Sequence, residues 1–462
     1  MPTKKWLKLG AKITKKRFFM KRTLEAELIA WKDRGEHLPI LLRGARQVGK
    51  SYLVEDFGKT YFEDIAIVDF ENRPELRIAF NTREPKEILS RLEIALQKKI
   101  KEKTTLLFLD EIQSCPEALI SLRYFKEQMP NLHVIAAGSL LEFLLHNENF
   151  SFPVGRVEFL YLHPLSFIEY LQEAAPILAT RLKEYNLDHI PSELEHQEFL
   201  KWVRRYLFIG GMPAAVKASL SQTTFYDSQR VHERILQAYE SDFGKYAKHV
   251  QHKYLHAIFQ KAPSVVGQIL KYSRIHEDIR SRELKPALEL LYRAGLIQRI
   301  FATTAAGLPL HAHIKSERFK LLYLDVGLLQ TATKTDATQF FEQEIMQINS
   351  GMVAEQFVGQ ELLAYSAPYQ NAPLLFWERM TGGLAEVDFV ETIKANVIPI
   401  EVKAGATGTL RSLHVFLNEK NSPLGVRIGE NPLSFHQKVL SIPFYLVNSI
   451  DSLVTQALSR TL

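Results

Sequence analysis

The chain has 462 residues, which is too long for one hydrophobic core, and a usual domain size of about 150 residues predicts three domains. A hydrophobic fraction of 46% and a charged fraction of 24% are ordinary for a soluble globular protein. No apolar run approaches the roughly 18 residues of a transmembrane helix, so we expect no membrane span. The single cysteine, Cys115, excludes an intramolecular disulfide framework and is typical of a cytoplasmic protein.

The net charge of +6 comes from a basic N-terminal extension, predicted at residues 1–21. Residues 1–22 hold nine Lys or Arg and no acid, whereas the rest of the chain holds 49 basic and 52 acidic residues, a net charge of −3. A basic arm of this kind can bind nucleic acid or anionic lipid. The alternative is an unpacked extension that precedes a functional first residue at Met20. It lacks the apolar segment of a secretory signal, so we do not expect export.

Strand and helix patterns alternate over residues 22–165. This alternation predicts an α/β fold in which helices cover both faces of a parallel sheet, with ligands at the carboxyl ends of the strands. The predicted strands are Leu38–Leu42, Ile65–Phe70, Thr105–Leu109, Leu132–Ala137 and Val157–Leu162. The predicted helices between them include Glu87–Ile100 and Glu117–Gln128.

The first strand leads directly into the sequence GARQVGKS, which has the G-x-x-x-x-G-K-S pattern of a phosphate-binding loop. The glycines let backbone N–H groups turn toward a phosphate, Lys50 can reach the β and γ oxygens, and Ser51 can offer its hydroxyl to Mg²⁺. The pattern predicts binding of a nucleoside triphosphate, taken as ATP, with Mg²⁺. The predicted loop residues are Gly44, Ala45, Arg46, Gln47, Val48, Gly49, Lys50 and Ser51.

Polar residues follow two other predicted strands of this sheet. Asp110 and Glu111 end the third strand, and we expect Asp110 to hold Mg²⁺ and Glu111 to polarise the water that attacks the γ-phosphate. Ser139 ends the fourth strand, and its hydroxyl could contact the γ-phosphate or orient the water. The alternative is that these three residues only cap the helices that follow.

Residues 166–255 have a helical pattern and predict a lid, and residues 256–340 predict a winged-helix-like segment and linker. Within the second segment we expect helices at Val265–Tyr272, Glu277–Arg280 and Glu283–Ala294, followed by a glycine and a strand. Residues 261–299 hold eight basic and four acidic residues, which suits a face that contacts DNA phosphates. The alternative is a winged helix that serves only packing or oligomer contacts.

A second chemical constellation lies in the C-terminal region, residues 341–462. Glu355 lies on a predicted helix, and Asp388 and Glu401 lie on neighbouring predicted strands. Because residues two apart on a strand share a face, Lys403 should lie beside Glu401. Paired carboxylates such as Asp388 and Glu401 can hold Mg²⁺ beside a phosphodiester, while a lysine positions water or stabilises charge. The alternative is a cross-strand salt bridge.

These motifs together resemble a known family. They are GARQVGKS, LLFLDEIQ, AAGS, PVGR with the following LHPLSF, GGMP, DVGL, AEVDFV and IPIEVK. With them the chain looks like the widespread prokaryotic AAA-type ATPases that carry an uncharacterised C-terminal domain. That domain is similar to the PD-(D/E)XK nuclease superfamily. The resemblance covers about Met20 to residue 445.

The resemblance implies roles for particular residues. Arg156, in the PVGR motif, is a candidate arginine finger or γ-phosphate sensor, in cis or in trans; the alternative is an ordinary surface arginine. Asp388, Glu401 and Lys403 match the D…E-x-K pattern of the nuclease superfamily, and Glu355 matches the helix acid of some members. The nucleotide site that the resemblance implies consists of Lys50, Ser51, Asp110, Glu111 and Ser139.

The expected fold is thus α/β: a P-loop parallel-sheet ATPase core with a helical lid, a winged-helix segment and a restriction-endonuclease-like C-terminal domain. Two functions are open. In the first, ATP drives an enzyme that binds or processes DNA, as a candidate homo-oligomer. In the second, slow ATP turnover makes a regulatory switch or scaffold whose nuclease-like domain is catalytically silent. The complete D…E-x-K set favours the first function, and the −3 charge of the chain after residue 22 favours the second.

Overall fold

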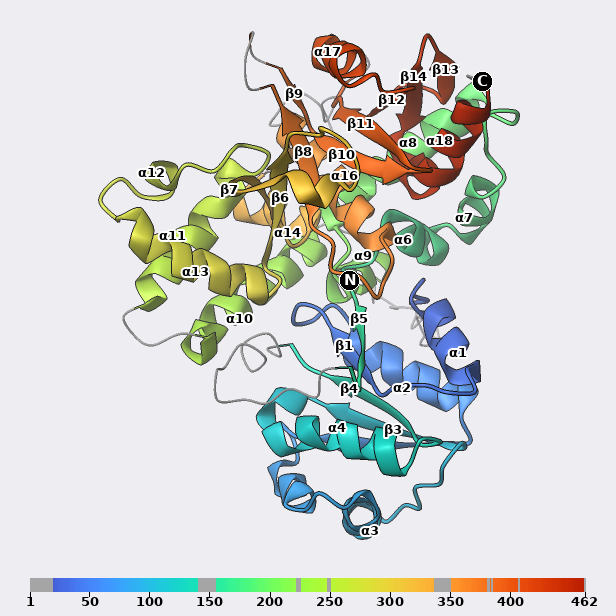
Figure 1. Ribbon diagram of the computed structural model, residues 1–462, viewed down its shortest axis with the longest axis vertical. Coiled ribbons are helices and arrows are strands. Elements are labelled where there is room, and N and C mark those ends of the chain that lie inside the picture. The colour runs from blue at the N-terminus through green and yellow to red at the C-terminus, as the bar shows by residue number, and fades with distance from the viewer. Residues whose placement is uncertain are drawn as a thin grey trace, which may run out of the picture.

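The computed structural model describes residues 20–139, 155–221, 226–246, 251–335, 350–379, 383, 385–405 and 408–460. The basic extension predicted at residues 1–21 lies outside these ranges, apart from its last two residues. Within the described ranges no helix is long and apolar enough to cross a membrane. Figure 1 shows one sheet with its helices at the bottom of the molecule, and further helices and strands above it.

The first sheet confirms the predicted parallel arrangement. Its described strands have the order β2-β3-β4-β1-β5, and every neighbouring pair is parallel. The strands are β1 (Ile40–Arg43), β2 (Asp64–Asp69), β3 (Thr105–Asp110), β4 (His133–Ala137) and β5 (Glu158–Tyr161). The helices around it are α1 (Glu25–Asp33), α2 (Lys50–Tyr61), α3 (Pro85–Leu96) and α4 (Pro116–Gln128).

Both faces of this sheet are covered, as the continuous apolar strands require. On β3, Leu106 and Phe108 belong to the hydrophobic cluster that includes α1 and α2, whereas Leu107 and Leu109 belong to the cluster that includes α3 and α4. Successive side chains therefore point to opposite helical layers. This buries β3 completely and places Asp110 at its carboxyl end.

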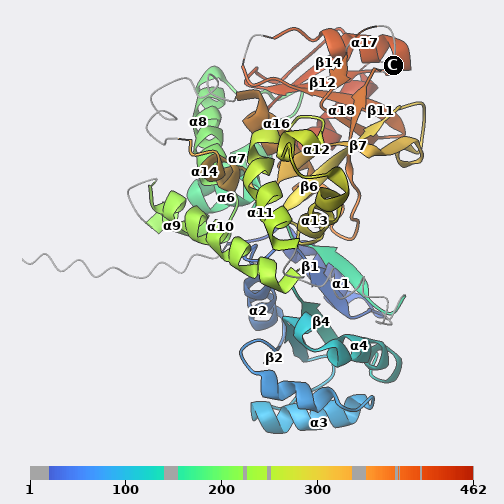
Figure 2. The ribbon, with the colours of Figure 1, turned by 90° about the vertical axis from the view of Figure 1, so that its left-hand side faces the viewer.

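The next segment is helical, as predicted, and lies above the first sheet in Figure 2. Capping boxes start two of its helices: Ser166 and Glu169 start α6, and Ser192 and Glu195 start α8. The longest of these helices, α10, is continuous from Tyr226 to Tyr246. The helices are α6 (Phe167–Ala174), α7 (Pro176–Leu182), α8 (Glu193–Ile209), α9 (Pro213–Ser221) and α10 (Tyr226–Tyr246).

Two of the three helices predicted between residues 261 and 294 are wrong. At the first, Gly267 has a φ of +72°, which ends helical geometry, and Val266 and Ile269 form β-bridges with the strand β7. Residues 277–280 are not helical. The third helix and the strand after Gly295 are confirmed. The observed elements are α11 (His252–Lys261), α12 (Tyr272–Ile275), α13 (Ser281–Arg293), β6 (Ile297–Thr303) and β7 (Ile314–Tyr323).

The hairpin of β6 and β7 continues into the C-terminal strands. β6 pairs antiparallel with β7 on one side and parallel with β8 on the other, so one sheet, ordered β7-β6-β8-β9, crosses the domain boundary expected at residue 340. Another sheet has the order β10-β11-β12-β14-β13. The strands are β8 (Leu374–Glu378), β9 (Glu386–Val387), β10 (Phe389–Ile393), β11 (Asn396–Val402), β12 (Gly425–Gly429), β13 (Ser434–His436) and β14 (Val439–Pro443).

The predicted strand that holds Asp388 is divided between these two sheets. β9 pairs with β8 and β10 pairs with β11, so Asp388 lies at the corner where the chain passes from one sheet to the other. The helices of this region are α14 (Val326–Ala332), α16 (Ser350–Tyr365), α17 (Arg411–Lys420) and α18 (Ile450–Ser459).

A buried carboxylate joins the helical segment to this region. Asp325 is 0% exposed and accepts hydrogen bonds from the backbone N–H groups of Gly211 (2.6 Å), Gly327 (3.0 Å) and Leu328 (3.0 Å). Burial raises the pKa of Asp325 to about 6, and these N–H groups oppose the shift. The GGMP and DVGL motifs therefore meet at one carboxylate.

Polar side chains on α16 fix that helix against its neighbours. The Gln356 amide pairs with both the N–H (2.7 Å) and the C=O (2.8 Å) of Tyr323, at the end of β7. Glu361 accepts hydrogen bonds from the backbone N–H of Phe167 (3.0 Å) and from the Tyr365 hydroxyl (2.7 Å). Burial raises the pKa of Glu361 to about 8. One helix is thus bonded to both the helical segment and the hairpin.

We expect Gly211→Ala to lower the free energy of unfolding by about 1–3 kcal/mol, because overpacking a fitted site costs that much. A Cβ at Gly211 would lie 2.0 Å from the carbonyl oxygen of Leu165. Gly35→Ala is the matched control, since nothing lies within 4 Å of its added Cβ. Urea unfolding followed by circular dichroism measures both, and equal midpoints for the two variants would contradict the packing account.

Candidate nucleotide site and acid cluster

The predicted phosphate-binding loop lies between β1 and α2, at the carboxyl edge of the first sheet. Gly44 (φ 148°), Gln47 (φ 66°) and Gly49 (φ 98°) all have positive φ angles, and α2 starts at Lys50. At Gly44 a Cβ would lie 2.3 Å from the carbonyl oxygen of Leu162, so only glycine fits. The loop thus precedes a helix N-terminus, whose free N–H groups favour phosphate.

Lys50 is folded back over this loop. Its side chain is buried, and Nζ donates hydrogen bonds to the carbonyl oxygens of Gly44 and Ala45, both at 2.9 Å. Burial lowers the pKa of Lys50 to about 8, opposed by the carboxylates of Glu111 and Asp110. An ammonium group held there can exchange carbonyl oxygens for phosphate oxygens without a change of fold.

The structure brings the other predicted residues to the same edge. Asp110 is buried and accepts a hydrogen bond from the Ser51 side chain; burial raises its pKa to about 6, and the Ser51 bond opposes that rise. Glu111 accepts hydrogen bonds from Gln113 Nε2 (2.5 Å) and from Ser139 Oγ (3.4 Å). A hydroxyl and a carboxylate in contact are the oxygen ligands that Mg²⁺ takes beside a phosphate, so the residues present fit the metal.

Contacts with residues outside the loop, which the sequence did not indicate, also hold the loop in place. Arg46 Nη1 pairs with Asp242 Oδ2 on α10 at 2.5 Å, and the Tyr239 hydroxyl on α10 donates to the Arg46 carbonyl at 2.8 Å. Arg22 Nη1 donates to the Val48 carbonyl at 3.0 Å. No local pattern marks these partners, because α10 is nearly 200 residues from the loop in sequence.

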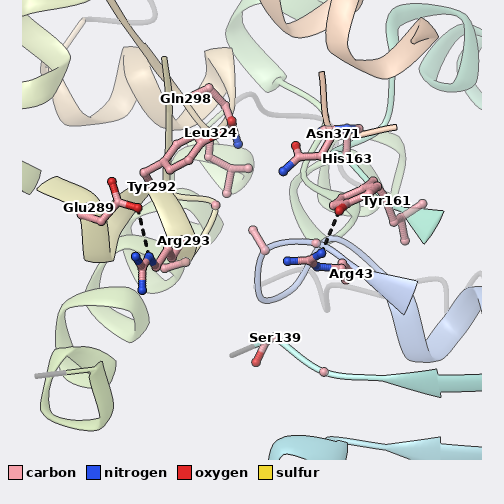
Figure 3. Close-up of a pocket in the computed structure, with 16 residues that line it drawn as sticks. Arg43, Ser139, Tyr161, His163, Glu289, Tyr292, Arg293, Gln298, Leu324 and Asn371 are labelled. Carbon is pink, nitrogen blue, oxygen red and sulfur yellow. Dashed lines mark hydrogen bonds and ion pairs between the residues drawn. The ribbon is translucent and has the colours of Figure 1, made fainter. Parts of the chain in front are cut away.

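A cavity of about 290 Å³ lies beside the loop (Figure 3). Its lining includes Gly44, Ala45 and Ser139. Tyr292 and Arg293 from α13 also line it. Arg293 pairs with Glu289 at 3.0 Å. The turn after α13 also lies against the loop, since a Cβ on Gly295 would lie 3.4 Å from that of Ala45. The segment at residues 256–340 therefore borders the nucleotide site directly.

Arg156 lies far from the loop of its own chain. It precedes β5, whereas the loop follows the parallel neighbour β1, so the two are at opposite ends of the sheet, roughly 15–20 Å apart at about 3.3 Å per residue. Its Nη2 lies 3.5 Å from Glu127 Oε1, and the side chain is half-exposed. This placement does not suit a γ-phosphate sensor in cis. Action in trans stays a prediction.

The second predicted set also comes together. Lys403 Nζ lies 2.6 Å from Glu401 Oε1, and Asp388 Oδ2 accepts a hydrogen bond from the backbone N–H of Val402 at 2.8 Å. Burial and the neighbouring Asp388 carboxylate raise the pKa of Glu401 to about 7. Glu355, on α16, faces the same corner. In the described parts of the chain, no three His, Cys, Asp or Glu side chains are arranged to hold a metal ion.

The residue that sequence reasoning missed here is Lys320. It lies on β7, is 1% exposed, and its Nζ lies 2.8 Å from Glu355 Oε1, 2.7 Å from Glu386 Oε1 and 3.6 Å from Asp388 Oδ1. Burial lowers the pKa of Lys320, but the three carboxylates outweigh burial and raise it above the usual value. We call Lys320, Glu355, Glu386, Asp388, Glu401 and Lys403 the acid cluster.

Comparison with known families divides the chain in three. Residues 36–171 match an AAA domain. Residues 200–339 match a domain of unknown function (DUF8612), and residues 350–445 match another (DUF4143). These two matches leave the winged-helix and nuclease-like interpretations without a named counterpart.

Three similar proteins from archaea illustrate the likeness. An uncharacterized protein of Methanocaldococcus jannaschii is 27% identical over 228 residues, which is 49% of this chain and 44% of that protein, so less than half of that relative is matched. A Walker-type ATPase of Pyrococcus abyssi is 16% identical, with a TM-score of 0.43 over 68% of this chain and 96% of the other. The Orc1 protein of Aeropyrum pernix, solved with DNA, is 12% identical, with a TM-score of 0.28 over 68% and 93%. The AAA match and the loop geometry together support an AAA-type P-loop ATPase domain at residues 36–171.

Proposed function

We propose that this protein is a Mg²⁺-dependent ATPase that couples ATP hydrolysis to the binding or processing of DNA. The observation that carries the ATPase part is the meeting of Lys50, Ser51, Asp110 and Glu111 at one edge of a parallel sheet. ATP and DNA are the proposed partners.

In this proposal each residue has one task. Lys50 supplies positive charge to the β- and γ-phosphates, and Ser51 and Asp110 hold Mg²⁺. Bound Mg²⁺ neutralises charge that develops on the phosphate oxygens. Glu111 accepts a proton from the attacking water, and Ser139, which donates to Glu111, orients that carboxylate.

Support for a DNA partner comes from residues 256–340. Three helices, α11 to α13, precede the β6–β7 hairpin, which is the element order of a winged helix, and the local charge favours phosphate contact. The hairpin also links the two sites. Gly295, just before β6, lies against Ala45, while Lys320 on β7 pairs with Ile300 of β6 and lies in the acid cluster.

A second candidate function is favoured by Lys320. An internal ammonium among three carboxylates offsets part of the charge of a nuclease-like site without a metal ion. In that case the protein is an ATP-dependent switch or scaffold, and the C-terminal part only binds a partner.

Lys50→Ala should weaken ATP binding roughly 10- to 100-fold, because a charged hydrogen bond is worth about 1.5–3 kcal/mol. Glu111→Gln should bind ATP normally and hydrolyse it roughly 10²- to 10⁴-fold more slowly, because only proton acceptance is lost. Titration with a fluorescent ATP analogue and phosphate release measure the two effects. Wild-type turnover in Glu111→Gln would show that Glu111 is not the catalytic carboxylate.

If Arg156 acts in trans in a homo-oligomer, Arg156→Ala should lower turnover by roughly 10³-fold or more. Mixing Arg156→Ala with Lys50→Ala subunits should then restore part of the activity, because a mixed interface joins an intact loop to an intact arginine. Arg123→Ala, an exposed arginine on α4 that also pairs with Glu127, is the matched control. No loss in Arg156→Ala, or no restoration on mixing, excludes a finger in trans.

DNA processing is tested by strand scission with Mg²⁺ or Mn²⁺. We expect wild-type protein to nick DNA when ATP is present, and Asp388→Asn and Lys403→Ala to lose this activity but keep ATP hydrolysis, because the two sites are separate. Lys394→Ala, at the exposed turn between β10 and β11, is the control. Full ATP hydrolysis without scission in the wild type would favour the switch.

A further inference from the structure

Lys320 enters the acid cluster from outside the C-terminal region. Glu355 comes from α16, Glu386 from β9 and Asp388 from the corner between β9 and β10, whereas Lys320 comes from β7, before residue 340. The main chain of β7 is held at this point on both sides, because Lys320 pairs with Ile300 and forms a β-bridge with Ile269. Its ammonium is therefore fixed in place.

The position of this ammonium is that of a bound cation. Nζ lies within 4 Å of three carboxylates, from α16, from β9 and from the corner after β9, and the side chain is 1% exposed. A divalent ion binds carboxylate oxygens at about 2.0–2.6 Å, and Asp388, which lies 3.6 Å from Lys320 Nζ, is one such ligand. Two cations in one such space repel strongly in a poorly solvated interior, so Lys320 and a metal ion compete.

The other half of the cluster has a buried carboxylate oxygen without a hydrogen-bond partner. Glu401 is 6% exposed, and its Oε2 is buried with no hydrogen-bond partner in the described parts of the chain. Only Oε1 is bonded, by Lys403 at 2.6 Å. An unpaired buried carboxylate oxygen is costly, and Asp388, whose charge acts on Glu401, lies on the same side. These two carboxylates are the ligands that a metal ion would use once Lys320 is removed.

We propose that Lys320 is an internal cation that keeps divalent metal ions out of the acid cluster of the nucleotide-free protein, and that Asp388 and Glu401 bind Mn²⁺ or Mg²⁺ once Lys320 is replaced by an uncharged residue. The inference concerns the acid cluster of the proposed function, but it needs neither ATP hydrolysis nor strand scission. It makes the cluster an inhibited metal site whose inhibitor is a strand of another segment.

The test measures Mn²⁺ binding to full-length, nucleotide-free protein. The readout is the electron paramagnetic resonance signal of the Mn²⁺ that stays free. Lys320→Met should bind one Mn²⁺ at the acid cluster, with an affinity at least tenfold higher than that of the wild type for the same site. Adding Asp388→Asn to Lys320→Met should abolish the gain, which assigns the ion to this cluster rather than to Ser51 and Asp110. Lys285→Met, which removes an exposed lysine that pairs with Glu317 of β7, should behave as wild type.

A second variant guards against failure of Lys320→Met to fold. Lys320→Met with Glu355→Gln removes a buried cation and a buried anion together, and leaves Asp388 and Glu401 in place. It should fold and show the same Asp388-dependent gain. The inference is overturned if the wild type already binds an Asp388-dependent Mn²⁺ as tightly as Lys320→Met does. It is also overturned if the folded double variant binds Mn²⁺ no more tightly than the wild type. Strand scission is measured in parallel, so a metal gain without scission supports this inference and rejects the nuclease.

Discussion

The buried carboxylate of Asp325 is the interaction on which the arrangement of the other parts depends. It gathers the N–H groups of Gly211, Gly327 and Leu328 at one fully buried point. Gly211 in turn accepts a hydrogen bond from the N–H of Leu165 at 2.7 Å, where the chain leaves the first sheet. A single buried acid thus joins the end of the P-loop sheet, the helical segment and the end of β7. Since removal of one partner leaves buried polar groups unpaired, these parts are held together as a unit.

The β6–β7 hairpin is the element common to both chemical sites. Leu324, at the end of β7, lines the cavity beside the phosphate-binding loop, and Lys320 lies a few residues away in the acid cluster. At about 3.3 Å per residue, Leu324 and Lys320 are roughly 10–15 Å apart along the chain. The hairpin therefore runs from the cavity beside the phosphate-binding loop to the acid cluster. Both proposed functions use this connection and differ in what the cluster does.

The two sites stabilise their buried lysine side chains in different ways. At the phosphate-binding loop, Lys50 is held by backbone carbonyl oxygens, which are neutral and can be exchanged for a ligand. In the acid cluster, Lys320 is held by carboxylates, whose charges cannot be left unpaired without a large cost. The first site is therefore ready for its ligand as it stands, while the second has its counter-ion built in.

The sequence by itself determined the P-loop, the strand that ends in Asp110 and Glu111, and the parallel sheet, because each rests on a local pattern: glycines before a lysine, or an apolar run before a charged pair. It also placed Glu355, Asp388, Glu401 and Lys403 in one neighbourhood. Only the tertiary structure decided what surrounds them. The helix predicted at residues 265–272 is lost to bridges with β7, and the Arg46–Asp242 pair and the Lys320 contacts join residues far apart in sequence, where no spacing rule applies. Local sequence patterns do not predict such partners, since the energy of a buried charge depends on the groups that the fold places beside it.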